Sequence, residues 1–109
     1  LGLTVGSISA SIHHSCIRNV TFRNAMMHHT FKGIYMKVDN HVTDPNATAE
    51  ITNILYENII MEEPEQVPIW IGPAQEVDSV GACSLAWPEL PRSTCPPPIP
   101  TVTWTNVTL

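Results

Sequence analysis

Apolar and polar residues alternate in several short segments of the chain, and these segments repeat one another. One set covers residues 17–27, 51–61 and 99–109. Alternation with a period of two predicts strands with one buried face, and the β-branched and aromatic residues of these segments suit a pleated surface. The segments align in four rows: Ile17/Ile51/Ile99, Val20/Ile54/Val102, Phe22/Tyr56/Trp104 and Asn24/Asn58/Asn106.

A second set of segments, residues 2–6, 33–37 and 68–72, interleaves with the first. Two short strands in each repeat of thirty-odd residues predict a parallel β-solenoid, in which equivalent residues stack from coil to coil. The aligned rows of this set are Leu3/Ile34/Ile69 and Val5/Met36/Ile71.

The repeat therefore predicts an all-β protein with about three coils. The first set steps by 34 residues from position 17 to 51 and by 48 from 51 to 99, and the extra length falls in a Cys/Pro-rich loop at about 74–98. The recurring Asn at the strand ends indicates a turn, because Asn tolerates the left-handed conformation. No segment keeps a helical apolar face, which excludes a helical fold. An antiparallel sandwich with similar strands stays open as the alternative.

Several phrases resemble glycoside hydrolase family 28, the polygalacturonases and their relatives. The stretch GLTVGS, Gly2–Ser7, is similar to the family's strand that follows Gly-His-Gly and ends in Gly-Ser. The stretch GIYMKV, Gly33–Val38, falls where the family has Arg-Ile-Lys, and phrases of the form I-x-N-[VI]-x-[FY]-x-N are typical of its fold. The resemblance covers residues 2–73 and, more loosely, 99–109. It implies a right-handed parallel β-helix and inverting hydrolysis of α-1,4-linked galacturonan.

The same resemblance shows where this chain departs from the family. The family's histidine maps onto Leu1 and its arginine onto Tyr35, so Lys37 and Tyr35 are the predicted substrate-binding residues. Inverting hydrolysis needs one carboxylic acid and one carboxylate, which the family takes from Asn-Thr-Asp and Asp-Asp motifs. The sequence contains neither motif, so no catalytic residue is assigned and we expect this chain alone to be inactive. The alternative is a structural component of an extracellular filament, wall or flagellar hair.

Composition narrows the partners and the compartment. The net charge is −5 and there is no Lys/Arg cluster, which argues against nucleic acid, and the apolar runs are too short for a membrane helix. Three Asn-x-Thr sequons at Asn19, Asn46 and Asn106 predict a secreted, extracellular glycoprotein. We expect a polysaccharide or glycan as ligand, and upstream coils or neighbouring chains stacked on the open ends, since coils cannot bury their apolar faces alone.

The three cysteines suggest one disulfide. In an oxidising compartment Cys83 and Cys95 are the natural pair, and their bond would stabilise the loop by roughly 3 kcal/mol in the chain-entropy model. Cys16 is then either a buried free thiol or the partner of a cysteine outside this chain.

The remaining candidates for chemistry have simpler explanations. Glu62, Glu63 and Glu65 are expected in a solvated turn. Adjacent histidines on a strand point to opposite faces, so the pairs His13-His14 and His28-His29 predict no metal site. No cofactor is expected. Trp70 and Trp104 lie in repeat strands, which favours packing in the fold.

Overall fold

The computed structural model describes residues 2–39, 44–73 and 102–109. The predicted Cys83–Cys95 disulfide, the loop at 74–98 and Leu1 lie outside these residues. The described part contains six strands. They are β1 (Leu3–Ser9), β2 (Ser15–His28), β3 (Ile34–Asp39), β4 (Ala49–Glu62), β5 (Ile69–Pro73) and β6 (Val102–Thr108).

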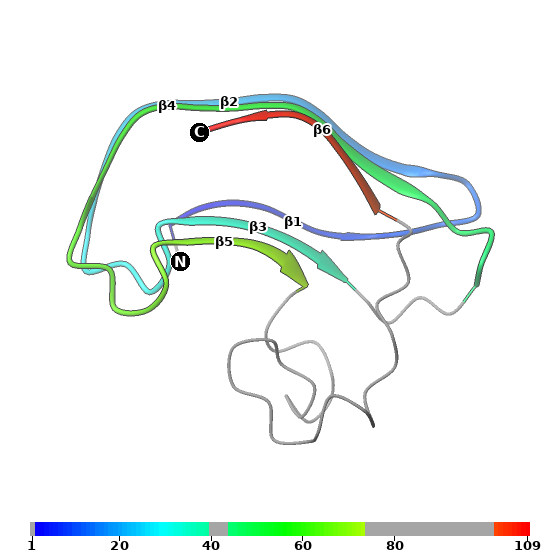
Figure 1. Ribbon diagram of the computed structural model, residues 1–109, viewed down its shortest axis with the longest axis horizontal. Coiled ribbons are helices and arrows are strands. Elements are labelled where there is room, and N and C mark those ends of the chain that lie inside the picture. The colour runs from blue at the N-terminus through cyan, green and yellow to red at the C-terminus, as the bar shows by residue number, and fades with distance from the viewer. Residues whose placement is uncertain (1, 40–43, 74–101) are drawn as a thin grey trace, which may run out of the picture.

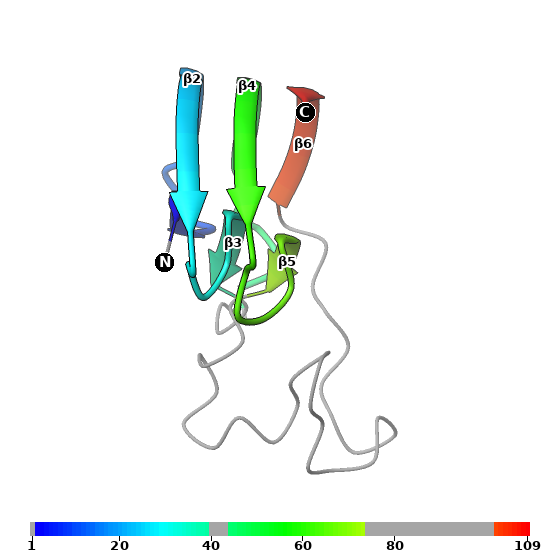
Figure 2. The same cartoon turned by 90° about the vertical axis from the view of Figure 1, so that its left-hand side faces the viewer.

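The strands form two three-stranded sheets that face each other (Figure 1). The short sheet has the order β1-β3-β5 and the long sheet the order β2-β4-β6, so successive passes of the chain add strands alternately to the two sheets. Every pairing between these strands is parallel. Figure 2 shows β2, β4 and β6 side by side in the long sheet. An all-β fold is thereby confirmed, and an antiparallel sandwich is excluded for the described strands.

The short sheet pairs as the sequence rows predict. Leu3 lies opposite Ile34, which lies opposite Ile69, and the row of Val5, Met36 and Ile71 follows. The register of β1 shifts after Val5, where Gly6 and Ser7 together face Lys37. Gly6 has φ 103°, and a Cβ there would clash with the carbonyl oxygen of Lys37, so this position requires glycine.

The long sheet confirms the first step of the repeat and corrects the second. β2 pairs with β4 at the predicted 34-residue offset, which places Phe22 beside Tyr56. β6 is shifted by five residues from the predicted alignment, because Trp104 pairs with Ile51 and not with Tyr56. β2 and β4 each contain the pattern apolar-x-Asn twice, with the copies five residues apart. β6 contains it once and pairs with the first copy, whereas the rows predicted from sequence align it with the second.

The core lies between the two sheets. Ile51 and Met36 are 0% exposed, and Ile54 is 1% exposed. Trp104 packs against this core as predicted, although from the Ile51 row. The rings of Phe22 and Tyr56 stack with centroids 4.9 Å apart. The two sheets therefore share one apolar layer built from residues of β1, β2, β3, β4 and β6, whereas Ile69 and Ile71 of β5 are 38% and 46% exposed.

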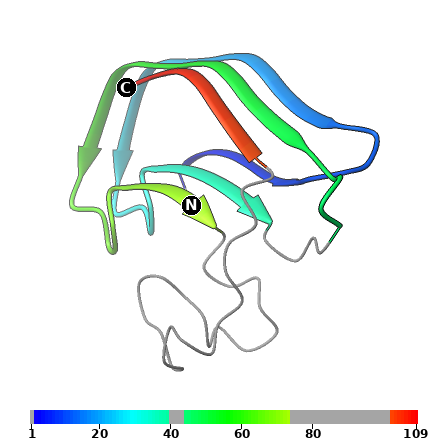
Figure 3. The same ribbon diagram turned by 45° about the vertical axis from the view of Figure 1, so that its right-hand side comes forward.

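The asparagines adopt the predicted left-handed conformation, but they lie within strands and not at strand ends. Asn19, Asn24, Asn53, Asn58 and Asn106 have φ between 52° and 57°. Each left-handed residue interrupts the extended backbone, and β2 and β4 bend around the core along their length (Figure 3).

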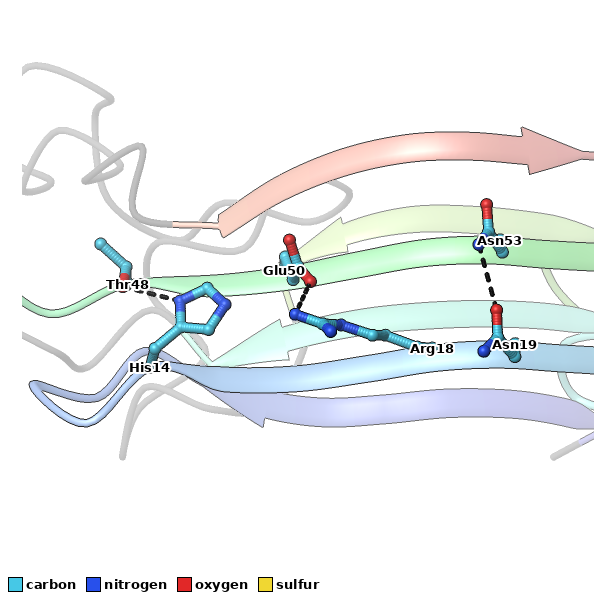
Figure 4. A network of polar contacts seen from close by, with 6 residues as sticks. All are labelled: His14, Arg18, Asn19, Thr48, Glu50 and Asn53. Atoms are coloured by element: carbon cyan, nitrogen blue, oxygen red, sulfur yellow. Dashed lines mark hydrogen bonds and ion pairs between the residues drawn. The ribbon is translucent and has the colours of Figure 1, made fainter.

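These asparagines form two ladders across the long sheet. Asn53 Nδ2 donates to Asn19 Oδ1 at 3.0 Å, and Asn106 Nδ2 donates to Asn53 Oδ1 at 3.1 Å. A second ladder joins Asn58 Nδ2 to Asn24 Oδ1 at 3.0 Å. Figure 4 shows the Asn19–Asn53 contact beside the neighbouring polar pairs of the same face. In each ladder, the side-chain amides of asparagines in successive coils are hydrogen-bonded to one another.

Two further observations concern single residues and membranes. Cys16 is exposed on β2, so the first alternative, a buried free thiol, is wrong, and pairing with a cysteine outside this chain stays a prediction. Within residues 2–39, 44–73 and 102–109 there is no helix of the length and hydropathy that crossing a bilayer requires.

Candidate substrate-binding face

The two predicted substrate-binding residues share the outer face of β3. Ile34 and Met36 belong to the core cluster, and strand alternation turns Tyr35 and Lys37 to the opposite side of the sheet. Tyr35 is only 5% exposed although it lies outside that cluster, whereas Lys37 is half-buried. Tyr35 is thus covered on the outside of the short sheet, and Lys37 is the more accessible of the two.

Lysine side chains cover the Tyr35 ring. The Nζ of Lys32 lies 5.0 Å from the ring centroid and the Nζ of Lys37 lies 5.4 Å from it. An ammonium within about 6 Å of an aromatic centroid is attracted by the negative face of the ring. Along the sheet, Tyr35 pairs in register with Thr4 on one side and Trp70 on the other. Trp70 therefore belongs to the outer row and not to the core row of its neighbours.

Sequence reasoning missed Lys32. The residue is 1% exposed, its Nζ donates to Gln66 Oε1 at 3.0 Å, and the same Nζ lies 4.6 Å from the centroid of the Phe31 ring. A signal was available, because the 34-residue offset between β2 and β4, continued into the turns, places Gln66 one coil above Lys32. These contacts hold the Lys32 side chain in place, with its ammonium over the Tyr35 ring.

This face offers the half-buried ammonium of Lys37 and, on the next strand, the half-buried ring of Trp70 beside the covered Tyr35. Such a combination can hold the carboxylate of an acidic sugar through an ammonium and the sugar's apolar face through a ring. The acidic side chains that the structure describes lie in turns or on the long sheet, and none comes from β1 or β5. Among the described side chains, no pair of carboxylates on this face could serve inverting hydrolysis.

The polar contacts of the long sheet have a different character. Arg18 pairs with Glu50, Arg23 pairs with Glu57, and His14 Nδ1 lies 2.9 Å from Thr48 Oγ1 (Figure 4 shows the first and the last of these contacts). All of them join a residue to the next coil across the sheet. They tie neighbouring coils of the long sheet together.

The second histidine pair contradicts the geometry assumed from the sequence. His29 has φ 51°, which breaks the strand alternation, and the His28 and His29 rings meet edge to face with centroids 4.1 Å apart. His29 Nε2 also lies 3.0 Å from Glu63 Oε2. The expectation that adjacent histidines diverge is therefore wrong at this position. Glu62, Glu63 and Glu65 are exposed in and beside a turn, as predicted.

The three sequons occupy two kinds of site. Asn19 and Asn106 lie in the ladder of the long sheet, where both bond to Asn53. Asn46 is exposed in a turn, with its backbone N–H donating to Asp44 Oδ1 at 2.8 Å. Asn46 is therefore the sequon whose described contacts involve only its backbone.

Together, the two sheets and the outer face of β3 define a protein of parallel strands in stacked passes, with an aromatic and cationic surface. A scan against protein-family models matches residues 1–85 to the glycosyl hydrolases family 28. The chain belongs to this family, and the resemblance read from its motifs is confirmed over that region. Comparisons with curated proteins and with solved structures give no match. Family membership implies a polysaccharide as the substrate class.

Proposed function

We propose that this chain forms coils of a right-handed parallel β-helix in a secreted, polygalacturonase-like glycoprotein, and that it binds an acidic polysaccharide on the outer face of the short sheet. The observation that carries the proposal is the placement of Lys37 and Lys32 around Tyr35 on β3, in a chain of glycosyl hydrolase family 28. Galacturonan, which carries a carboxylate on each sugar, is the ligand class that this charge suits.

The electrostatics support binding at this face in particular. The chain as a whole has a net charge of −5, so a polyanion is repelled by most of its surface. Lys37 on β3 and Lys32, just before β3, place positive charge on this face. Lys32 is buried and bonded to Gln66, so Lys37, which is half-buried, is the residue that contacts the sugar carboxylate. Tyr35 holds Lys37 over its ring and limits the orientations of the ammonium.

Inverting hydrolysis requires a pair of suitably placed carboxyl groups, and the motifs that supply them in the family are not found in this sequence. The inverting reaction needs two carboxyl groups about 6.5–9.5 Å apart, and both aspartate motifs of the family are absent from these residues. We therefore assign binding, and not bond cleavage, to residues 1–109. In a longer protein that supplied the aspartates, Lys37 would form part of the floor of the cleft.

The test compares polygalacturonate with a neutral galactan by isothermal titration calorimetry. We expect polygalacturonate to bind more tightly and Lys37→Ala to weaken it at least about tenfold, as for the loss of a charged hydrogen-bond partner. Arg23→Ala removes the same charge from the outer face of the long sheet and is the matched control. If Lys37→Ala and Arg23→Ala weaken binding equally, net charge and not this site governs it, and the proposal is wrong.

A reducing-sugar assay on the same samples addresses hydrolysis. We expect no release of reducing ends by residues 1–109, whatever their affinity. Release by these residues would contradict the assignment of binding alone. If polygalacturonate and galactan both fail to bind, the alternative of a structural component is favoured, and the ladders of the long sheet are the observation that supports that alternative.

We also propose N-glycosylation of this chain, with Asn46 as the most readily occupied sequon. A glycan on Asn106 would replace one hydrogen of the Nδ2 group that donates to Asn53, whereas Asn46 has no ladder contact among the described residues. Peptide mass spectrometry before and after enzymatic deglycosylation gives the occupancy of each site. Full occupancy of Asn106 with an unmodified Asn46 would reverse this order.

A further inference from the structure

We propose that His28, His29 and Glu63 form a binding site for a divalent transition-metal ion such as Zn²⁺ or Cu²⁺. The site lies where the chain leaves the long sheet for the short one, at the ends of β2 and β4. It is separate from the outer face of β3 and does not depend on the function proposed for that face.

The ligand atoms are already close together. One nitrogen from each histidine and one oxygen from Glu63 all lie within 4.8 Å of one another. Ligands bound at about 2.0–2.1 Å to a tetrahedral ion lie about 3.3–3.4 Å apart, so only small side-chain rotations are needed to close the site. The contact of 3.0 Å between His29 Nε2 and Glu63 Oε2 already falls near that separation.

The backbone places these side chains without help from a metal. His29 and Glu63 are 34 residues apart, one coil above the other, and both are left-handed with φ of 51° and 48°. The stacked turns are joined by backbone hydrogen bonds from His29 N to Glu62 O at 3.1 Å and from Glu65 N to Thr30 O at 2.9 Å. Two of the three ligand positions, His29 and Glu63, therefore hold the same unusual conformation in adjacent coils, and His28 precedes the first of them.

The donor set selects the class of ion. Two imidazoles and one carboxylate suit Zn²⁺, Cu²⁺ or Ni²⁺, whereas Ca²⁺ and Mg²⁺ prefer oxygen ligands alone. The neighbouring carboxylates of Glu62 and Glu65 are exposed and add negative charge that favours a cation. The site is open to solvent, so water can complete the coordination of the ion.

The other histidine pair is a natural control. His14 is also left-handed, with φ 58°, but its Nδ1 lies 2.9 Å from Thr48 Oγ1, and the residue one coil above it is therefore a threonine and not a carboxylate. His13 and His14 match the proposed ligands in residue type and exposure and lack the third ligand. Any binding due to surface imidazoles in general would occur equally at both pairs.

The experiment titrates the purified protein with ZnCl₂ by calorimetry and follows the histidine ring resonances by NMR. We expect one Zn²⁺ per chain, shifts confined to the rings of His28 and His29, and reversal by a chelator. His29→Asn keeps a residue that tolerates the left-handed conformation but removes the nitrogen ligand, and Glu63→Asn does the same for the carboxylate. Each variant should weaken Zn²⁺ binding at least about tenfold, while the double variant His13→Ala/His14→Ala leaves it unchanged.

Three results would overturn the proposal. The first is the absence of saturable Zn²⁺ or Cu²⁺ binding up to millimolar concentration by protein that circular dichroism shows to be folded. The second is binding that His29→Asn and Glu63→Asn leave unchanged, since the ion would then lie elsewhere. The third is tighter binding of Ca²⁺ than of Zn²⁺, which would indicate carboxylates alone.

Discussion

The outer faces of the two sheets differ although the sheets share one core. On the long sheet, like residues or complementary pairs recur from coil to coil, as in the ladder of Asn19, Asn53 and Asn106. On the short sheet, the row of Thr4, Tyr35 and Trp70 contains three different side chains. A side chain that recurs in each coil can bond to its copy in the next coil and so stabilises the stack. A row whose side chain changes at each coil presents a surface that differs from position to position. This difference supports the proposal that the ligand binds on the short sheet.

Truncating a core side chain should destabilise the fold to a similar extent in either sheet. Ile51 of the long sheet and Met36 of the short sheet are both 0% exposed. Ile51→Ala and Met36→Ala should each lower the free energy of unfolding by about 2–5 kcal/mol, the largest effects expected here, because each leaves a cavity in one common core. Urea denaturation followed by circular dichroism gives both values. A loss confined to one variant would mean that the two sheets unfold separately.

The ladder should contribute most at its centre. Asn53 donates to Asn19 and accepts from Asn106, whereas Asn58 has one ladder bond among the described residues. Asn53→Ala should cost about 2–3 kcal/mol, from lost hydrogen bonds and from a left-handed alanine, and Asn58→Ala about 1 kcal/mol less.

Asn53→Gly separates the two causes of that loss. Glycine restores the backbone freedom without the amide, so it should recover roughly 1 kcal/mol relative to Asn53→Ala. Equal destabilisation by Ala and Gly would show that conformation contributes nothing at this position.

The buried hydroxyl of Tyr56 should be dispensable. Tyr56 is 3% exposed, and within the described part of the chain its hydroxyl has no hydrogen-bond partner, while Phe22 occupies the same row one coil earlier. Tyr56→Phe should raise the free energy of unfolding by about 1 kcal/mol, because it removes an unsatisfied polar group. Thermal denaturation at neutral pH measures the change.

The same residue makes stability depend on alkaline pH. Burial raises the pKa of Tyr56 from its ordinary value of 10.0 to about 12, since the phenolate would lose its hydration. Between those values the unfolded chain loses this proton and the folded chain keeps it, so stability falls as the pH rises from 10 to 12, by up to about 1.4 kcal/mol per pH unit. Tyr56→Phe should flatten this decline, and an unchanged slope would assign it to other groups.

The ion pairs on the outer face of the long sheet should matter least. The side chains of Arg23 and Glu57 are 56% and 46% exposed, so water screens their attraction. Arg23→Gln should change the free energy of unfolding by less than about 0.5 kcal/mol, and less still in high salt. A larger effect would place these pairs with the asparagine ladder as a source of stability.

Most of the strand rows could be predicted from sequence, because period-two alternation and a constant offset carry that information directly. The alignment of β6 could not be decided by apolar pattern alone, since Ile17-x-Asn19 and Phe22-x-Asn24 are equally good templates. The tripeptide Asn-Val-Thr, shared by positions 19–21 and 106–108, favoured the alignment that the structure shows.

The proximity of His28, His29 and Glu63, on which the proposed metal site rests, was missed for a physical reason. We assumed that His28 and His29 follow the alternation of a strand, but a left-handed residue turns the second ring toward the first. The stacking of His29 and Glu63 followed from the 34-residue offset, whereas the conformation of His29 did not. Nothing in the residue type marks such a histidine, because asparagine is the usual residue at these positions.

The asparagine ladder also shows that the number of residues in a coil does not determine where its strand lies in the sheet. The chain takes 34 residues from Asn19 to Asn53 and 53 from Asn53 to Asn106, a difference of 19 residues. Both steps nevertheless end in the same kind of hydrogen bond, from Nδ2 of one asparagine to Oδ1 of the asparagine one coil earlier. Because the entropic cost of a longer connection grows only with the logarithm of its length, one coil can accept an inserted peptide while its neighbours keep their places. Sequence inserted between the end of one sheet and the start of the next would thus be free to diverge, and the fold can acquire new surface without repacking its interior.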